Sequence, residues 1–192
     1  LRRGVQIHRY SSDAPGIYAF SRVDPASRQE YVLAFNNDTK PHSARFKTYA
    51  KGGFTPVHPA DGKPLTADGT LTVEVPGLDF VIFKAERPIP RADAAPAVRF
   101  AGLVDNGVLI QDRFVSVELS DEALADVTFA AKIGDGEFEP LGRDLNPPYR
   151  VFFKLGNHAN GTPVVFRATA GDYAGHTRTA QVKARIEIGR AS

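Results

Sequence analysis

The segment ATAGDYAGH, residues 168–176, places an aspartate and two glycines between two strand-like runs. In the simplest interpretation Asp172 closes a hairpin turn by bonding its own backbone. The other interpretation is a calcium site, because calcium takes six to eight oxygen ligands. Asp105 and Asn106 are the further oxygen donors that could join Asp172 in such a site. Apart from this calcium alternative, we expect no cofactor.

Four aromatic side chains are candidates for stacking on the faces of sugar rings, and we expect them to be partly exposed: Tyr49, Phe54, Tyr149 and Tyr173. Tryptophan, the best platform for such stacking, is absent from the chain. The alternative is ordinary packing, with Tyr49 and Phe54 at a sheet edge and Tyr149 opening a core strand. The sequence leaves both interpretations open.

Motifs for other chemistries are missing. None of the five histidines lies three or four residues from another, so a zinc site would need distant partners. There is no Gly-x-Ser-x-Gly elbow for a serine nucleophile and no glycine-rich phosphate loop. Most acidic residues fall in Asp-Gly turns or alternate outward along strands, where they make no catalytic pair. We therefore predict no catalytic residue.

The amino-acid composition limits the classes of binding partner and the chemistry that the chain can support. The chain has 192 residues and a net charge of +2, which gives no electrostatic case for nucleic acid or an anionic membrane. No apolar run reaches the roughly 18 residues of a membrane span. Cysteine is absent, which excludes disulfides and thiolate chemistry. The chain contains no methionine and starts at Leu1, so we expect a fragment of a longer or processed protein.

Hydrophobic residues recur with period two along most of the chain, and helical periodicity is nearly absent. About six strands are expected in residues 1–86, at 4–10, 16–23, 30–37, 43–49, 71–75 and 80–83. Residues 87–96 contain three prolines and predict a semi-rigid linker. About seven strands follow in residues 97–192, including a two-residue hairpin at Asp135-Gly136, and this count matches an immunoglobulin-like sandwich. The predicted fold is all-β, with two small antiparallel sandwiches in tandem.

The segment EYVLAFNNDTK, residues 30–40, reads as a strand that runs into a polar cluster. Such a cluster is either the edge of an active site or the turn that follows the strand. Asn36 and Asn37 can satisfy local backbone groups through their side chains, which favours the turn.

The first 86 residues resemble the region that follows the catalytic barrel in the alpha-amylase family of glycoside hydrolases. The similar segments are LRRGVQIHRY (1–10), GIYAFSR (16–22), YVLAFNN (31–37) and VEVPGLDFVIF (73–83). The family's C-terminal β-sandwich, domain C, has strands of this kind in this order. Residues 97–192 resemble the immunoglobulin-like domains appended to secreted bacterial glycosidases.

The resemblance implies a non-catalytic accessory fragment of an α-glucan-active enzyme, outside the cell or in its envelope. Its partner would be the catalytic barrel upstream of Leu1 in the same polypeptide, with an α-glucan as a further ligand. The family's catalytic acids lie on that barrel, so none is carried over to this chain. Two alternatives stay open: a starch-binding module, and a surface adhesion or protein-binding domain.

Overall fold

The computed structural model describes residues 4–120 and 124–187. The described residues form strands, turns and loops and contain no helix, so the predicted all-β class is confirmed. None of them forms a helix long and apolar enough to cross a membrane. The chain divides into two compact units, residues 1–91 and 92–192, which we call the first and the second unit.

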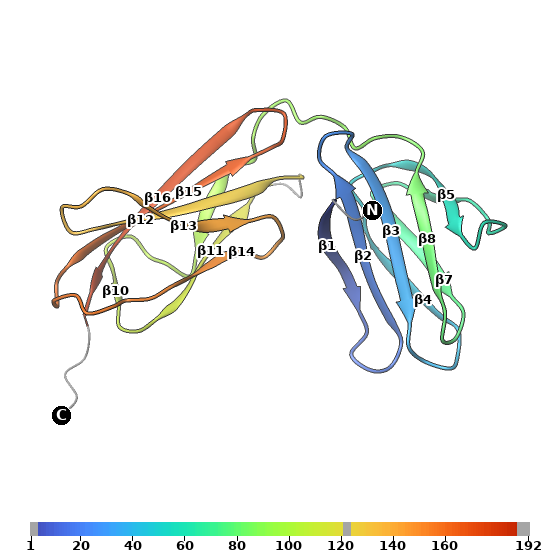
Figure 1. Ribbon diagram of the computed structural model, residues 1–192, viewed down its shortest axis with the longest axis horizontal. Helices are drawn as coiled ribbons and strands as arrows, with labels where there is room; N and C mark the ends of the chain where they lie inside the picture. Colours follow the sequence, from blue (N-terminus) through green and yellow to red (C-terminus); the bar gives the residue numbers. More distant parts are fainter. Residues whose placement is uncertain (1–3, 121–123, 188–192) are drawn as a thin grey trace. The chain divides into compact units, whose positions relative to one another are not determined.

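In the first unit, residues 4–91 form eight strands in two sheets, shown at the blue-to-green end of the chain in Figure 1. The larger sheet has six strands in the order β1-β2-β3-β8-β5-β6, and β4 pairs with β7 in the smaller sheet. The strands are β1 (Val5–Ser11), β2 (Ile17–Asp24), β3 (Gln29–Asn36), β4 (His42–Lys47), β5 (Gly52–His58), β6 (Leu65–Ala67), β7 (Thr70–Val75) and β8 (Phe80–Ala85).

Two of these strands, β5 and β6, are missing from the sequence prediction. β5 begins with two glycines and contains Pro56, and these residue types are depleted in strands. The structure tolerates Pro56 because the pairing of β5 with β8 shifts register between Pro56 and His58. β6 has only three residues, too few for a visible alternation.

Asn36 ends β3 and joins it to the end of β7. Its side chain is buried, and its Nδ2 donates to the carbonyl oxygens of Lys40, Val75 and Pro76 at 2.8, 3.1 and 3.0 Å. The neighbouring Asn37 accepts a bond from the backbone N–H of Gly16 at 2.7 Å. The expected structural role of both asparagines is confirmed, and the polar cluster of this segment holds a turn.

A buried ionic network, made of Arg9, Ser21 and Glu30, connects the first three strands. The Glu30 side chain is completely buried, and its Oε1 accepts from Arg9 Nη2 at 2.8 Å and from Ser21 Oγ at 2.6 Å. Its Oε2 accepts from the backbone N–H of Ala50 at 2.7 Å. The Arg9 guanidinium also lies over the Tyr49 ring, 4.3 Å from its centroid. The network therefore fixes β1, β2, β3 and the loop before β5 relative to one another.

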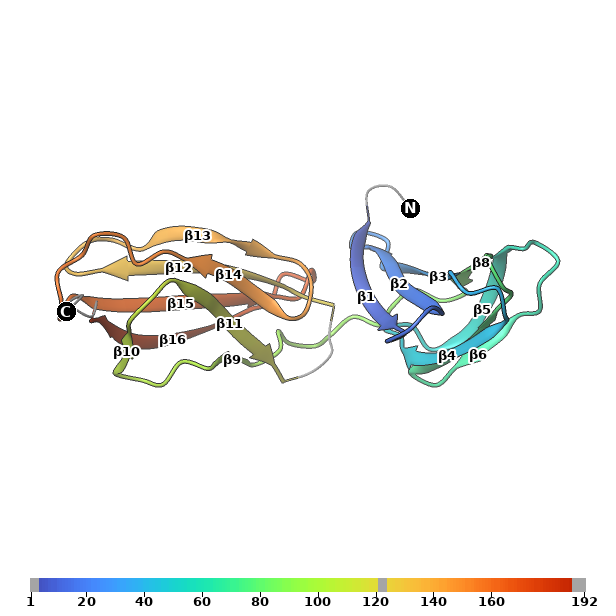
Figure 2. The ribbon, with the colours of Figure 1, turned by 90° about the horizontal axis from the view of Figure 1, so that it is seen from below.

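The described residues of the second unit, 92–120 and 124–187, also form eight strands. Most of them run along the long direction of this unit (Figure 2). One sheet has the order β10-β16-β15-β12-β13 and the other β14-β11-β9, and only the β10–β16 pair is parallel. The strands are β9 (Val98–Ala101), β10 (Gly107–Leu109), β11 (Arg113–Leu119), β12 (Asp126–Ile133), β13 (Glu139–Asp144), β14 (Tyr149–Phe153), β15 (Pro163–Gly171) and β16 (Thr177–Ile186). The finer immunoglobulin-like assignment stays a prediction.

Side chains of both sheets form one core in the second unit. Val115 and Val117 of β11 are buried as the alternation predicts. Phe153 of the smaller sheet meets Phe166 of the larger one edge to face, with the ring centroids 4.9 Å apart. The hairpin predicted at Asp135-Gly136 is longer than two residues, because β12 ends at Ile133 and β13 begins at Glu139. Phe138 therefore lies in the loop and is not part of a strand.

Replacing Glu30 by glutamine should destabilise the first unit by about 3–5 kcal/mol, because it leaves the buried guanidinium of Arg9 without a counter-charge. Urea unfolding, followed by far-UV circular dichroism and tyrosine fluorescence, measures this effect. The control is Glu118→Gln in the exposed Arg99–Glu118 pair, which should cost less than about 1 kcal/mol. Equal losses in the two variants would contradict the assigned role of the network.

Candidate docking surface and the predicted site residues

One face of the six-stranded sheet carries aromatic side chains that the core does not cover. On β3, Val32 and Ala34 point into the core and are fully buried, whereas Phe35 is 41% exposed on the other face. We call this outer surface the aromatic face. Its residues are His8, Tyr18, Phe20, Leu33, Phe35, His58, Phe80 and Ile82, all of which are half-buried or exposed.

Strand register arranges the aromatic face in two rows. Tyr18, Phe35 and Phe80 pair across β2, β3 and β8. The second row runs His8, Phe20, Leu33, Ile82 and His58 across five strands. Since neighbouring strands lie about 4.8 Å apart, the second row is roughly 20 Å long. Arg22, Tyr31 and Lys84 form the next row, where the apolar surface gives way to charge.

The rings of the aromatic face stack on one another. Phe20 and Phe35 have centroids 6.0 Å apart and planes 14° apart, and Phe35 and Phe80 have centroids 5.5 Å apart and planes 25° apart. His58 stacks on Phe80 with a centroid distance of 4.3 Å. Near-parallel rings at these distances are offset-stacked, so each covers part of its neighbour's face. This geometry suits packing against an apolar protein surface better than stacking on sugars.

A sheet that is apolar on both faces is normally covered on both faces. Exposed contiguous apolar surface on a folded domain marks an interaction site. Aromatic residues are also enriched at the centres of protein interfaces. The sequence shows the alternation of β3 but not which set of side chains faces the core, because both sets are apolar. The aromatic face was therefore missed by sequence reasoning.

Substituting the aromatic face should cost little stability in the isolated chain. Phe35→Ala removes a half-exposed ring and two stacking contacts and should cost about 1 kcal/mol. Phe54→Ala is the comparison, because Phe54 is fully buried, and its loss should cost about 3–5 kcal/mol. Urea unfolding gives both values. A cost for Phe35→Ala as large as that for Phe54→Ala would show that this ring belongs to the core.

The four aromatic residues proposed for sugar binding are divided between the two units and differ in exposure. The expected exposure is wrong for Phe54, which is fully buried, and for Tyr149, which is 5% exposed and donates its hydroxyl to the Ala125 carbonyl at 3.3 Å. A buried ring presents no face to a sugar, so both residues serve as core residues. Tyr49 is half-buried with the Arg9 guanidinium over one face. Tyr173 is half-buried in the β15–β16 turn, at a positive φ of 52°. Sugar binding by Tyr49 or Tyr173 stays a prediction.

The structure does not bring together Asp105, Asn106 and Asp172, the three residues proposed for a calcium site. Asp172 lies at the β15–β16 turn, whereas Asp105 accepts a bond from the backbone N–H of Lys183, far along β16. Seven residues of extended strand separate these points, or roughly 23 Å. Within residues 4–120 and 124–187, no group of three or more histidine, cysteine or acidic side chains is arranged to hold a metal ion.

Asp172 instead stabilises the turn between β15 and β16 through hydrogen bonds. Its Oδ1 accepts from the backbone N–H groups of Ala174 and His176 at 2.9 and 3.0 Å, and its Oδ2 accepts from His176 Nδ1 at 2.6 Å. Burial alone would raise the pKa of Asp172, but the hydrogen bonds from the His176 side chain and the two backbone groups outweigh burial and lower the pKa. The hairpin interpretation of this segment is confirmed.

This lowered pKa makes the second unit sensitive to acid. A carboxyl whose pKa is lower in the folded state stabilises the fold above its ordinary value, near 3.8, and loses that effect as the pH falls further. Asp172→Asn should therefore destabilise the second unit by about 1–3 kcal/mol at pH 7. The difference from the unmodified chain should shrink below about pH 4. Urea midpoints across pH measure it, with the exposed Asp135→Asn as control, and a difference independent of pH would contradict the assignment.

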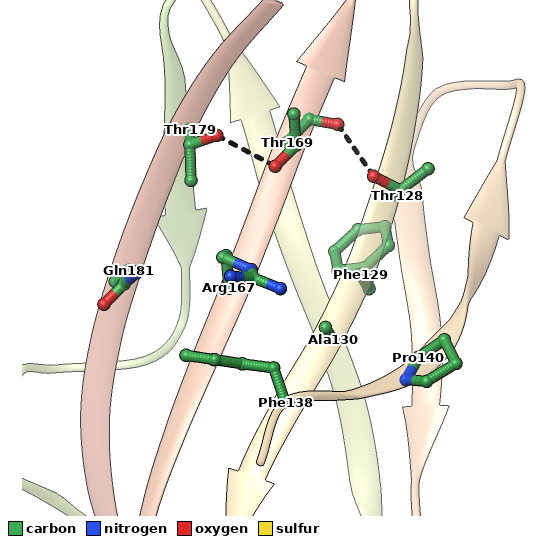
Figure 3. Close-up of a pocket in the computed structure, with 9 residues that line it drawn as sticks. All are labelled: Thr128, Phe129, Ala130, Phe138, Pro140, Arg167, Thr169, Thr179 and Gln181. Carbon is green, nitrogen blue, oxygen red and sulfur yellow. Dashed lines mark hydrogen bonds between the residues drawn. The ribbon is translucent and has the colours of Figure 1, made fainter.

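The second unit has a shallow hollow of about 520 Å³ on the outer face of its larger sheet (Figure 3). It is lined by Thr128, Phe129, Ala130, Phe138, Pro140, Arg167, Thr169, Thr179 and Gln181. The Arg167 guanidinium lies 4.0 Å from the centroid of the Phe138 ring. Sequence reasoning missed this hollow because Phe138 and Arg167 are distant in the chain and meet only through the fold.

The two units thus define an all-β protein with an uncovered aromatic face and no catalytic cluster identified among its described residues. The chain is 34% identical over 188 residues to an alpha-amylase of Streptomyces lividans. The match covers 96% of this chain and 20% of that protein, so the chain spans about a fifth of the length of this curated relative. The predicted resemblance to the alpha-amylase family is confirmed, and the match is consistent with a C-terminal region of such a protein.

No family model matches the chain. Among solved structures, an endo-β-1,4-mannanase of Thermotoga petrophila is similar over 51% of this chain and 21% of its own, with 13% identity and a TM-score of 0.38. A β-1,2-glucanase of Parabacteroides distasonis is similar over 96% of this chain and 34% of its own, with 12% identity and a TM-score of 0.34. Similarities of this size carry no argument about fold or function.

Proposed function

We propose that the chain is a non-catalytic accessory part of a longer alpha-amylase-like glycosidase, and that the first unit supports the catalytic domain of the same polypeptide. The aromatic face is the observation that carries this proposal. The match to a fifth of an alpha-amylase supports this occupant, because the remaining four fifths of such a protein leave room for a catalytic domain that could cover the face.

The dimensions and chemistry of the aromatic face fit this role. Protein interfaces of standard size bury about 800 Å² on each partner around an apolar centre with a polar rim. The two aromatic rows would form that centre, and the row of Arg22, Tyr31 and Lys84 would form part of the rim. Docking would bury Tyr18 and Phe35, which are 42% and 41% exposed in this structure.

In this proposal the second unit is a spacer or an interaction domain, and its immunoglobulin-like assignment is supported by its strand pairing. β9, β11 and β14 form one sheet, and β12, β15 and β16 form the centre of the other. The constant-type immunoglobulin domain divides its strands in a similar way, with A, B and E in one sheet and C, F and G in the other. An extracellular or cell-envelope location and the absence of nucleic-acid and membrane partners are parts of the same proposal. So is the expectation that no cofactor is needed.

The alternatives have weaker support. A starch-binding module built on Tyr49, Phe54, Tyr149 and Tyr173 loses two of its four rings to the cores of the two units. A surface adhesion or protein-binding domain would use exposed apolar side chains of the second unit such as the rings of Phe114 and Phe152, each 49% exposed. No feature of these rings selects a partner.

The test uses the longer alpha-amylase-like protein that contains this chain. The double variant Tyr18→Ser/Phe35→Ser should lower the thermal midpoint of the catalytic domain by about 4–8 °C, because buried aromatic residues at interfaces carry about 2 kcal/mol or more. The matched control is Phe114→Ser/Phe152→Ser, which removes two exposed rings, each 49% exposed, from the second unit. Calorimetry and residual activity after heating are the readouts.

The proposal also predicts that the 192-residue chain alone releases no reducing sugar from soluble starch. Release of reducing sugar by the pure chain would overturn the non-catalytic role. Equal thermal midpoints for the aromatic-face variant and the unmodified protein would overturn the docking role.

A further inference from the structure

We propose that the hollow on the second unit binds a neutral oligosaccharide, and specifically a segment of α-glucan chain. The choice of α-glucan over other neutral sugars rests on the proposed function, whereas the site itself rests on the geometry of the hollow. A volume of about 520 Å³ lies within the range of small-ligand sites.

Strand register explains why the surface is hollowed here. Arg167 on β15 pairs with Ala130 on β12 and with Gln181 on β16. The small side chain of Ala130 leaves space beside Arg167, and Phe138 reaches across from the β12–β13 loop to close one side (Figure 3). Thr128, Thr169 and Thr179 pair in the next row and line the other side.

The polar groups of the hollow are held in place but keep hydrogen-bonding capacity. The Phe138 ring fixes the Arg167 guanidinium by a cation–π contact, which uses the flat face of the guanidinium and leaves its N–H groups at the rim. Thr169 and Thr179 share one hydrogen bond of 2.9 Å between their hydroxyl groups. Across residues 4–120 and 124–187, no hydrogen bond or ion pair joins the Arg167 guanidinium or the Gln181 amide to another residue.

These groups match the chemistry of a sugar. Sugar hydroxyl groups accept from guanidinium and amide N–H groups, and they also donate to threonine and amide oxygens. The Phe138 and Pro140 side chains offer apolar surface for the C–H groups of the sugar ring. Arg167 is the one charged residue that lines the hollow, and its charge already lies against an aromatic ring. Anion sites instead use charge-assisted bonds from paired or clustered cations, so a neutral ligand fits better.

The experiment uses the 192-residue chain and two neutral probes. Affinity electrophoresis in gels with soluble starch should retard the chain, and titration with maltoheptaose should shift the NMR signals of residues lining the hollow. Arg167→Ala should weaken binding about tenfold or more, because it removes charge-assisted hydrogen bonds. Gln181→Ala, at an exposed position that should not affect folding, should weaken binding several-fold.

The matched control is Arg150→Ala, because Arg150 forms the same kind of contact elsewhere on the second unit, 4.5 Å from the centroid of the Phe114 ring. This variant should bind like the unmodified chain. Unchanged mobility in starch gels, binding insensitive to both Arg167→Ala and Gln181→Ala, or a preference for polygalacturonate over starch would each overturn the proposal. These readouts do not involve Tyr18 or Phe35, so failure here and failure of the docking role are separate results.

Discussion

The fully buried carboxylate of Glu30 is the constraint around which the first unit is organised. A buried charge is costly unless ion pairs and hydrogen bonds satisfy it. Three groups do so here: the Arg9 guanidinium from β1, the Ser21 hydroxyl from β2 and the backbone N–H of Ala50. The Tyr49 ring lies against the guanidinium. Because these groups come from two strands and a loop, and Glu30 itself lies on β3, satisfying one carboxylate sets the positions of three strands and a loop.

That constraint also determines which side of the sheet remains uncovered. Glu30, Val32 and Ala34 alternate along β3, so the face that holds Glu30 is the inner face. Leu33 and Phe35 must then point outward, although their hydrophobicity alone would suit the core equally well. The aromatic face therefore follows from the position of the buried charge. A covering partner would bury the aromatic face without disturbing this network.

The sequence predicted most strands because alternation is a local signal. It failed where the signal was weak, as in β5 with its glycines and Pro56, or too short, as in β6 and β10. It could not identify the contacts that depend on the fold, such as Arg9 with Glu30 or Arg167 with Phe138. The exposure of individual side chains could not be predicted either. Phe54 and Phe35 both lie on strands, yet Phe54 is fully buried and Phe35 is 41% exposed. The roles of Asn36 and Asp172 were predictable because their partners lie in nearby turns.

The position of Arg9 near the end of β1 has a mechanical consequence. A pull on the chain ahead of Val5 acts along β1, which pairs antiparallel with β2 from Val5 to Ser11. Such a load shears several backbone hydrogen bonds at once, and it must also withdraw the guanidinium from a carboxylate that has no access to water. A load applied ahead of Val5 is therefore transmitted into the sheet as a whole, and the first unit should move as a rigid block under force.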